Sequence, residues 1–385
     1  MKKKLIFSSI IFLFFSTIFA DVIYSPDWDY SLDLPEGFLI VDEQDRARFR
    51  LQHSALPVEL LILSYNNERY DTSRLALDDV FTKLQAEFDI AEIEWRNETQ
   101  SIGCFSATMN NVLQTGWAVS VVLPENRGTT VFLCYAPEEI FADCEQIVIS
   151  CLDSICIDRG SNFEAGIFTQ YAFPNEGEQK IELEIAGKKI KTSIDSVDVL
   201  ANEFVIQREY NILKFYADSD MWKEAWQRYY RLIYRDSYKR LEKVAFDIYS
   251  KLSSDIRKNN SDNFESAFAQ TLLSWVQTFE YKRIPVGTDF ASLLSIIGGE
   301  GSDCDSRAML LCVLLDQMNY DTMLFVSLEY SHAILGINLE GVGAKISVGD
   351  KNYLVGETTA PVNLGQIAQN QSDLNKWIHI EGMQY

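Results

Sequence analysis

The chain lacks the features that mark several large functional classes. Its 34 Lys and Arg residues are outnumbered by 56 Asp and Glu residues, which gives a net charge of −22. We therefore expect no nonspecific nucleic-acid binding and no docking on anionic lipid, because both need a basic surface. Beyond its first twenty residues the chain has no apolar run long enough to cross a bilayer, and it has no internal repeats or low-complexity tracts. The composition, 47% hydrophobic, predicts a globular protein.

Histidine is scarce and cysteine is irregularly spaced. The chain has three histidines and seven cysteines, with no CxxC pair and no Cys/His spacing typical of a zinc site. The acidic turn from Glu300 to Asp305 lacks the regular spacing of a calcium loop. We therefore expect no metal and no cofactor. Spacing leaves open how the five N-terminal cysteines would pair, namely Cys104, Cys134, Cys144, Cys151 and Cys156.

The first twenty residues form a separate segment. Lys2, Lys3 and Lys4 precede an apolar run from Leu5 to Phe19, and Ala20 offers a small residue for cleavage. This pattern predicts a signal peptide over residues 1–20 and a periplasmic or secreted protein with no stable membrane insertion after cleavage. The alternative is an uncleaved anchor, because Ile18 is larger than the residue preferred at that position.

Residues 21–156 are expected to form one α/β domain. Helical spacing predicts a helix from Leu77 to Phe88, and a second apolar-faced helix is expected from Phe141 to Leu152. The expected strands are Val58 to Tyr65, Ser101 to Met109, Gly116 to Leu123 and Thr129 to Tyr135, the last three as a meander. This order, opened by Trp28-Asp-Tyr-Ser-Leu-Asp-Leu-Pro-Glu-Gly-Phe, resembles the PsbP/Mog1-like fold. The resemblance implies an α/β sandwich with an antiparallel sheet, used for binding or scaffolding.

Residues 157–240 are expected to connect two domains. Residues 157–180 are typical of a linker, and a hairpin follows with its turn at Gly187 and Lys188. From Val197 the pattern becomes helical and rich in aromatic residues as far as Asp236. Those aromatic residues form either a carbohydrate or peptide platform or the packing core between domains. Residues 241–385 place helices before strands, which predicts an α+β domain with an antiparallel sheet.

Three residues of the C-terminal domain stand in the order of a nucleophilic triad. Cys304 lies at the start of an apolar helix, where unpaired N–H groups and the helix dipole favour thiolate. His332 opens a strand-like run, and Glu357 follows the next one. A thiolate nucleophile, an imidazole base and an acid that orients the imidazole are the groups that amide acyl transfer needs.

The segments around these residues resemble the bacterial transglutaminase-like superfamily, whose core is papain-like. The similar segments are Gly301-Ser-Asp-Cys-Asp-Ser-Arg-Ala, Ser331-His-Ala, Glu357-Thr-Thr and the helix end Val276-Gln277. The resemblance implies that Cys304 is the nucleophile, His332 the base, Glu357 the third member and Gln277 a candidate oxyanion donor. Two departures are Glu357, where many members carry Asp, and Ser302, inserted in the turn.

The sequence leads us to expect an exported cysteine peptidase or amidase that acts on protein or peptide amides of the cell envelope. A protein-crosslinking transamidase and a catalytically silent binding or scaffold protein stay open as alternatives. Asp303 and Asp305 flank the cysteine and would raise its pKa if they faced the sulfur, although one of them is also suited to cap the helix.

Overall fold

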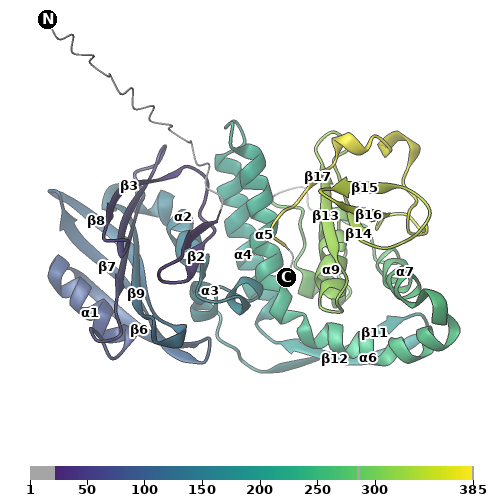
Figure 1. Ribbon diagram of the computed structural model, residues 1–385, viewed down its shortest axis with the longest axis horizontal. Helices are drawn as coiled ribbons and strands as arrows, with labels where there is room; N and C mark the ends of the chain where they lie inside the picture. Colours follow the sequence, from purple (N-terminus) through teal and green to yellow (C-terminus); the bar gives the residue numbers. More distant parts are fainter. Residues whose placement is uncertain (1–21, 284–286, 384–385) are drawn as a thin grey trace, which may run out of the picture.

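The computed structural model describes residues 22–283 and 287–383. The expected signal peptide, residues 1–20, lies outside the described residues. Figure 1 shows two lobes with helices α4 (Asp198–Phe215) and α5 (Trp222–Arg240) between them. Among the described residues, no helix combines the length and the apolar character needed to cross a membrane.

The N-terminal lobe is built on a seven-stranded antiparallel sheet in the order β3-β4-β5-β9-β8-β7-β6. Its strands are β3 (Phe38–Gln44), β4 (Arg48–His53), β5 (Glu59–Tyr65), β6 (Glu87–Trp95), β7 (Glu98–Met109), β8 (Val112–Leu123) and β9 (Gly128–Pro137). Helix α1 (Ser73–Leu84) and helix α2 (Phe141–Asp153) belong to two separate apolar cores, which hold side chains from opposite faces of the sheet. A small sheet of β1 (Ile23–Ser25), β2 (Tyr30–Leu32) and β10 (Ile155–Cys156) completes this α/β sandwich.

The first helix ends earlier than its periodicity predicts. Gln85 adopts a left-handed conformation with φ of 54°, and its N–H bonds back to the last turn. The chain leaves the helix there, so Phe88 lies in β6 rather than on the helix. The expected three-stranded meander therefore has a fourth strand, β6, paired along its whole length with β7. A helix that ends at a left-handed residue is usually predicted from a glycine, and Gln85 does not provide that signal.

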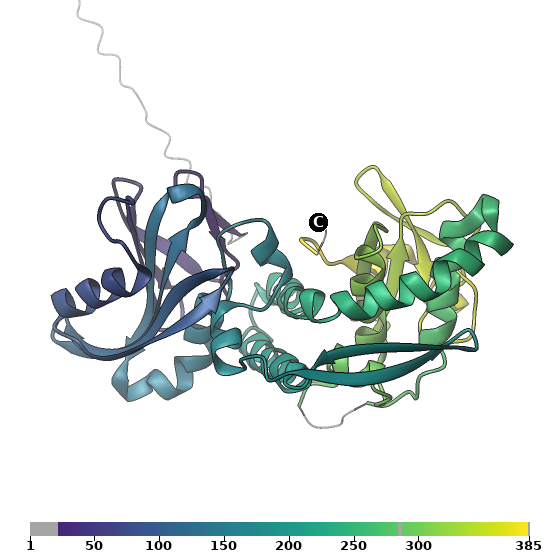
Figure 2. The ribbon, with the colours of Figure 1, turned by 90° about the horizontal axis from the view of Figure 1, so that it is seen from below.

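The connecting segment contains more structure than a linker. Helix α3 (Ile167–Ala172) lies within residues 157–180. The hairpin of β11 (Glu178–Ile185) and β12 (Lys188–Asp195) turns at Ala186 and Gly187, both with positive φ, so Lys188 is part of the strand and not of the turn. In Figure 2 the hairpin runs along the C-terminal lobe, and its apolar side chains join the core of that lobe.

Helix α5 uses two faces to contact the two lobes. Tyr229, Tyr230 and Tyr234 are at most 5% exposed and pack in the C-terminal core, so the structure places these aromatic residues in a packing role. On the other face, the Arg228 guanidinium donates to Glu209 of α4 at 2.7 Å and to the Ser150 hydroxyl of α2 at 2.8 Å. The two lobes are therefore joined through a buried polar network.

The C-terminal lobe is α+β, with a five-stranded antiparallel sheet in the order β15-β16-β14-β13-β17. The strands are β13 (Thr322–Ser327), β14 (His332–Ile337), β15 (Lys345–Val348), β16 (Lys351–Gly356) and β17 (Ile378–His379). The helices are α6 (Glu242–Asn259), α7 (Phe264–Val276), α8 (Leu293–Ile297) and α9 (Cys304–Asp316). Helix α9 is buried nearly all round, as its composition predicts, and packs against β13 and β14.

Candidate active site

Cys304 is the first residue of the buried helix α9. The preceding residue, Asp303, is the N-cap, and its Oδ1 accepts hydrogen bonds from the Ser306 N–H at 2.9 Å and the Ser306 hydroxyl at 2.5 Å. This capping fixes the helix start, since it satisfies an N–H group that the helix itself cannot. The Cys304 side chain therefore sits at the positive end of the helix dipole, and it is fully buried.

The side chains of His332 and Glu357 are hydrogen-bonded to each other in the C-terminal lobe. His332 is the first residue of β14, and Glu357 directly follows β16, with 2.8 Å between His332 Nε2 and Glu357 Oε2. The other carboxylate oxygen accepts from the N–H and hydroxyl of Thr359 at 2.7 and 2.6 Å. Burial opposes ionisation of Glu357, but the bonds from His332 and Thr359 outweigh it and lower the pKa of Glu357. The acid is thus held as a carboxylate that orients the imidazole.

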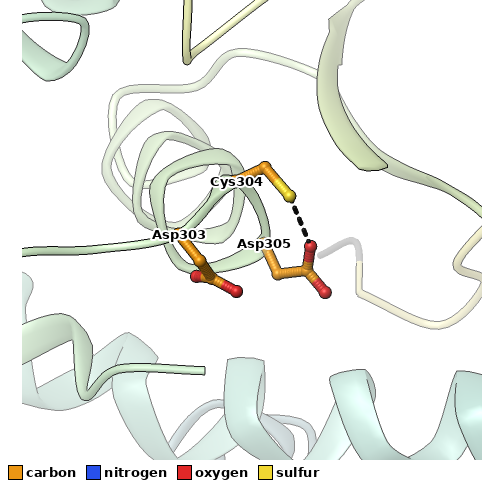
Figure 3. A group of neighbouring side chains, drawn as sticks. All are labelled: Asp303, Cys304 and Asp305. Carbon is orange, nitrogen blue, oxygen red and sulfur yellow. Dashed lines mark hydrogen bonds between the residues drawn. The ribbon is translucent and has the colours of Figure 1, made fainter. Parts of the chain in front are cut away.

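The Cys304 thiol makes its hydrogen bond to Asp305 rather than to His332. Cys304 Sγ lies 3.0 Å from Asp305 Oδ1, as Figure 3 shows, and the other carboxylate oxygen of Asp305 accepts from the Tyr230 hydroxyl of α5. The sequence left open which flanking acid would cap the helix and which would face the sulfur. The structure assigns the cap to Asp303 and the sulfur contact to Asp305.

Burial and two neighbouring acids keep this thiol protonated in the arrangement described. Burial raises the pKa of Cys304 far above its usual range, and the charges of Asp305 and Asp303 raise it further, against a smaller lowering by the Ala333 N–H. Burial also raises the pKa of Asp303 to about 7 and raises the pKa of Asp305. The helix N-terminus alone therefore does not make this cysteine a thiolate.

The Gln277 side chain is engaged in two hydrogen bonds, and its role as an oxyanion donor stays a prediction. It is the C-cap of α7, and its side-chain Nε2 donates to the backbone carbonyls of Glu357 at 2.7 Å and Val362 at 2.9 Å. Both amide hydrogens are thereby used. In this arrangement Gln277 anchors the segment that carries Glu357, and it could act as an oxyanion donor only if one of these bonds broke.

Arg307, one turn after Cys304, is a site residue that the sequence analysis missed. It is 1% exposed and donates to the Ser302 hydroxyl at 2.9 Å and to the Phe279 carbonyl at 2.8 Å, with a longer contact of 3.4 Å to the Thr358 carbonyl. A buried guanidinium with these partners ties the turn before Cys304 to the turn after Glu357. An arginine inside an apolar helix was the available signal, because such a charge needs buried partners.

We assign no metal to the acidic cluster around the cysteine. Side-chain oxygen and sulfur atoms of Asp303, Cys304 and Asp305 lie within 4.8 Å of one another. The Asp303 carboxylate caps α9, and that of Asp305 accepts from the thiol and from Tyr230. These internal hydrogen bonds account for the arrangement of the cluster.

Comparisons with known proteins give a fold resemblance at low identity. No family model and no curated protein sequence matches the chain. Among solved structures, the Ran-binding protein Mog1p of Saccharomyces cerevisiae is 9% identical, with 36% of this chain and 94% of that one covered and a TM-score of 0.28. PsbP of the cyanobacterium Synechocystis is 11% identical, with 36% and 92% covered and a TM-score of 0.29. A Bacteroides thetaiotaomicron protein is 10% identical, with 83% and 87% covered and a TM-score of 0.25. The Mog1 and PsbP structures are similar to the N-terminal part, and the transglutaminase-like nature of the C-terminal part stays a prediction.

Proposed function

We propose that the C-terminal lobe is a thiol acyl-transfer enzyme, a cysteine peptidase or amidase, with Cys304 as nucleophile, His332 as base and Glu357 as the orienting acid. The observation that carries this proposal is the 2.8 Å contact between His332 Nε2 and Glu357 Oε2. It lies at the start of β14, the strand against which the cysteine helix packs. An imidazole fixed by a buried carboxylate beside a helix-terminal cysteine is the arrangement that nucleophilic catalysis requires.

The reaction would proceed through Nδ1 of His332, the ring nitrogen that does not contact Glu357. Because Nε2 is bound to Glu357, Nδ1 is left to accept the thiol proton. The sulfur keeps the electron pair and attacks an amide carbonyl carbon, and the protonated imidazole then gives its proton to the leaving amine. The Cys304 backbone N–H, at the first position of α9, is the candidate donor to the oxyanion.

The second candidate function is a catalytically silent binding or scaffold protein. The observation that favours it is the full burial of Cys304 together with the bond from its thiol to Asp305. A thiol held in this way is protonated and out of reach of substrate. The two candidates differ in whether the thiol can pass its proton to His332.

Alkylation separates the candidates. Iodoacetamide labelling of Cys304 would be followed by mass spectrometry across pH in wild type and His332→Ala, with Cys312, a buried thiol in the same helix, as internal control. For an enzyme, the bond from the thiol to Asp305 opens transiently, so wild-type Cys304 is labelled at a lower pH than Cys312 and His332→Ala removes that difference. Equal labelling curves in the two proteins, or labelling only where Cys312 also reacts, would exclude the enzyme.

The acceptor and the cellular setting form the remaining part of the proposal. An acyl-enzyme passed to water makes a hydrolase, and one passed to an amine makes a crosslinking transamidase, so incorporation of a labelled primary amine into a glutamine-containing protein distinguishes them. The N-terminal signal pattern favours a periplasmic or secreted protein that acts on protein or peptide of the cell envelope. The N-terminal lobe would then hold a partner or substrate next to the site.

A further inference from the structure

The single proton of the Cys304 thiol has two possible acceptors in this site. A thiol has one hydrogen to donate, and here it is directed at Asp305 Oδ1, 3.0 Å away. The same hydrogen cannot be donated to His332 at that moment. Proton transfer to the imidazole therefore requires that the sulfur first gives up its bond to Asp305.

Asp305 is itself held in place from the connector helix. The Tyr230 hydroxyl donates to the carboxylate oxygen that the thiol does not use. Tyr230 is 1% exposed, and its ring packs against those of Tyr229 and Phe290 at centroid distances of 5.1 and 6.3 Å. The buried and packed Tyr230 ring therefore places its hydroxyl where it orients the Asp305 carboxylate toward the thiol.

Titratable groups from four elements of the structure surround the thiol and Asp305. The acids and phenols are Tyr229 on α5, Tyr281 and Asp289 in the segment before α8, and Asp303 at the N-cap of α9. The positive or basic groups are Arg283 before α8, Arg307 on α9 and His332 on β14. Among the side chains that the structure describes, Asp305 is the one that accepts a hydrogen bond from the sulfur, whereas the Ala333 N–H only donates to it, so Asp305 is placed to decide where the proton lies.

We propose that Asp305 is a positioning residue that retains the thiol proton of Cys304, so that the resting protein is latent until this bond is released. This proposal rests on the proposed function, since latency has meaning only if His332 can receive the proton. On release, the S–H bond breaks, the sulfur keeps the electron pair and the proton moves to His332 Nδ1. Nothing is oxidised or reduced, and Asp305 remains a carboxylate bound to Tyr230.

The test is the pH titration of Cys304 in the full chain, read by the ultraviolet absorbance of its thiolate. The absorbance of a matching Cys304→Ser protein is subtracted, so the readout needs no reagent to reach the buried sulfur. Asp305→Asn keeps the side chain's shape and its acceptor for Tyr230, and its amide can donate to the sulfur. The titration midpoint should fall by at least about one pH unit, a tenfold or larger gain in thiolate at a given pH.

Asp303→Asn is the matched control, because it removes the same charge one residue away and asparagine is an equally good N-cap. Its midpoint should fall by clearly less than that of Asp305→Asn, since Asp303 does not touch the sulfur. Equal shifts in the two variants, or an unchanged midpoint in Asp305→Asn, would overturn the positioning role.

Adding His332→Ala to each protein separates this inference from the proposed function. If Asp305→Asn lowers the midpoint and His332→Ala raises it again, both proposals hold. If Asp305→Asn lowers the midpoint and His332→Ala does not change it, Asp305 retains the thiol proton as proposed, but His332 does not act as the base of a triad. A midpoint that responds to His332→Ala and not to Asp305→Asn keeps the triad and overturns the role of Asp305.

Discussion

Substitution of Glu209 by Gln should loosen the junction between the two lobes. Glu209, on α4, is 1% exposed and accepts from Arg228 at 2.7 Å, from Arg208 at 2.7 Å and from the Ser150 hydroxyl at 2.8 Å. The substitution conserves volume but removes the charge and turns one acceptor into a donor that faces a guanidinium. Arg228 is then left with Asp33, 3.7 Å away, as its carboxylate partner.

The expected loss follows from the cost of leaving a buried charge without its partner, about 3–5 kcal/mol. We expect the lower end of this range for Glu209→Gln, because Arg208 keeps its 2.8 Å ion pair with Asp153. A loss of about 3 kcal/mol raises the unfolding equilibrium constant roughly a hundredfold. With a urea slope of about 3 kcal/mol/M, the unfolding midpoint would fall by about 1 M.

Urea unfolding followed by tryptophan fluorescence and by far-ultraviolet circular dichroism measures this loss. Glu203→Gln is the control, because it makes the same chemical change on an exposed position of the same helix and should stay within about 0.5 kcal/mol of wild type. If Glu209→Gln unfolds within about 1 kcal/mol of wild type at an unchanged slope, the network is not what holds the lobes together.

Three further substitutions test other parts of the structure. Gln277→Ala removes the donor to two backbone carbonyls, those of Glu357 and Val362, and should cost about 1–3 kcal/mol in chemical unfolding; a loss under about 0.5 kcal/mol contradicts the anchoring role. Arg307→Met should lower the free energy of unfolding by at least about 3 kcal/mol, since buried oxygens near the site lose their hydrogen-bond donor. A variant as stable as wild type would show that the turns around the site do not depend on Arg307. Burial raises the pKa of Asp316 to about 7, so the native state retains a proton that an unfolded carboxyl with a pKa near 3.9 releases. As the pH rises from about 4 to 7, the free energy of unfolding of wild type should therefore fall relative to that of Asp316→Asn, by up to about 1.4 kcal/mol per pH unit. A difference between the two proteins that stays flat or rises with pH refutes the raised pKa of Asp316.

The sequence predicts the features that depend on neighbouring residues. Asp303 before Cys304, together with the apolar run from Ala308 to Leu315, predicts a buried helix that begins at Cys304, and the structure has that helix. His332 opens a strand as expected, and the C-terminal lobe has the antiparallel sheet of the predicted α+β class. Each of these signals is contained within about ten residues.

Contacts between distant segments are not predictable in this way. The 2.8 Å distance between His332 and Glu357 depends on the register of β14 against β16, and a triad order in the sequence does not fix it. The Tyr230 bond to Asp305 joins residues 75 positions apart, on helices α5 and α9. For the same reason the sequence could not show that the Gln277 side-chain amide donates to the backbone carbonyls of Glu357 and Val362.

Helix α5 determines where the molecule can be divided. Its arginines at positions 228, 231 and 235 bind the N-terminal lobe, while Tyr230 and Tyr234 donate to Asp305 and Asp316 of the C-terminal lobe. A fragment that starts after Arg240 lacks helix α5, so the carboxyls of Asp305 and Asp316 would be exposed to water. A fragment that ends at Arg240 lacks the C-terminal lobe, so Tyr230 and Tyr234 would be exposed instead. Because helix α5 contributes side chains to the cores of both lobes, we expect neither lobe to cover this helix fully when it is produced without the other.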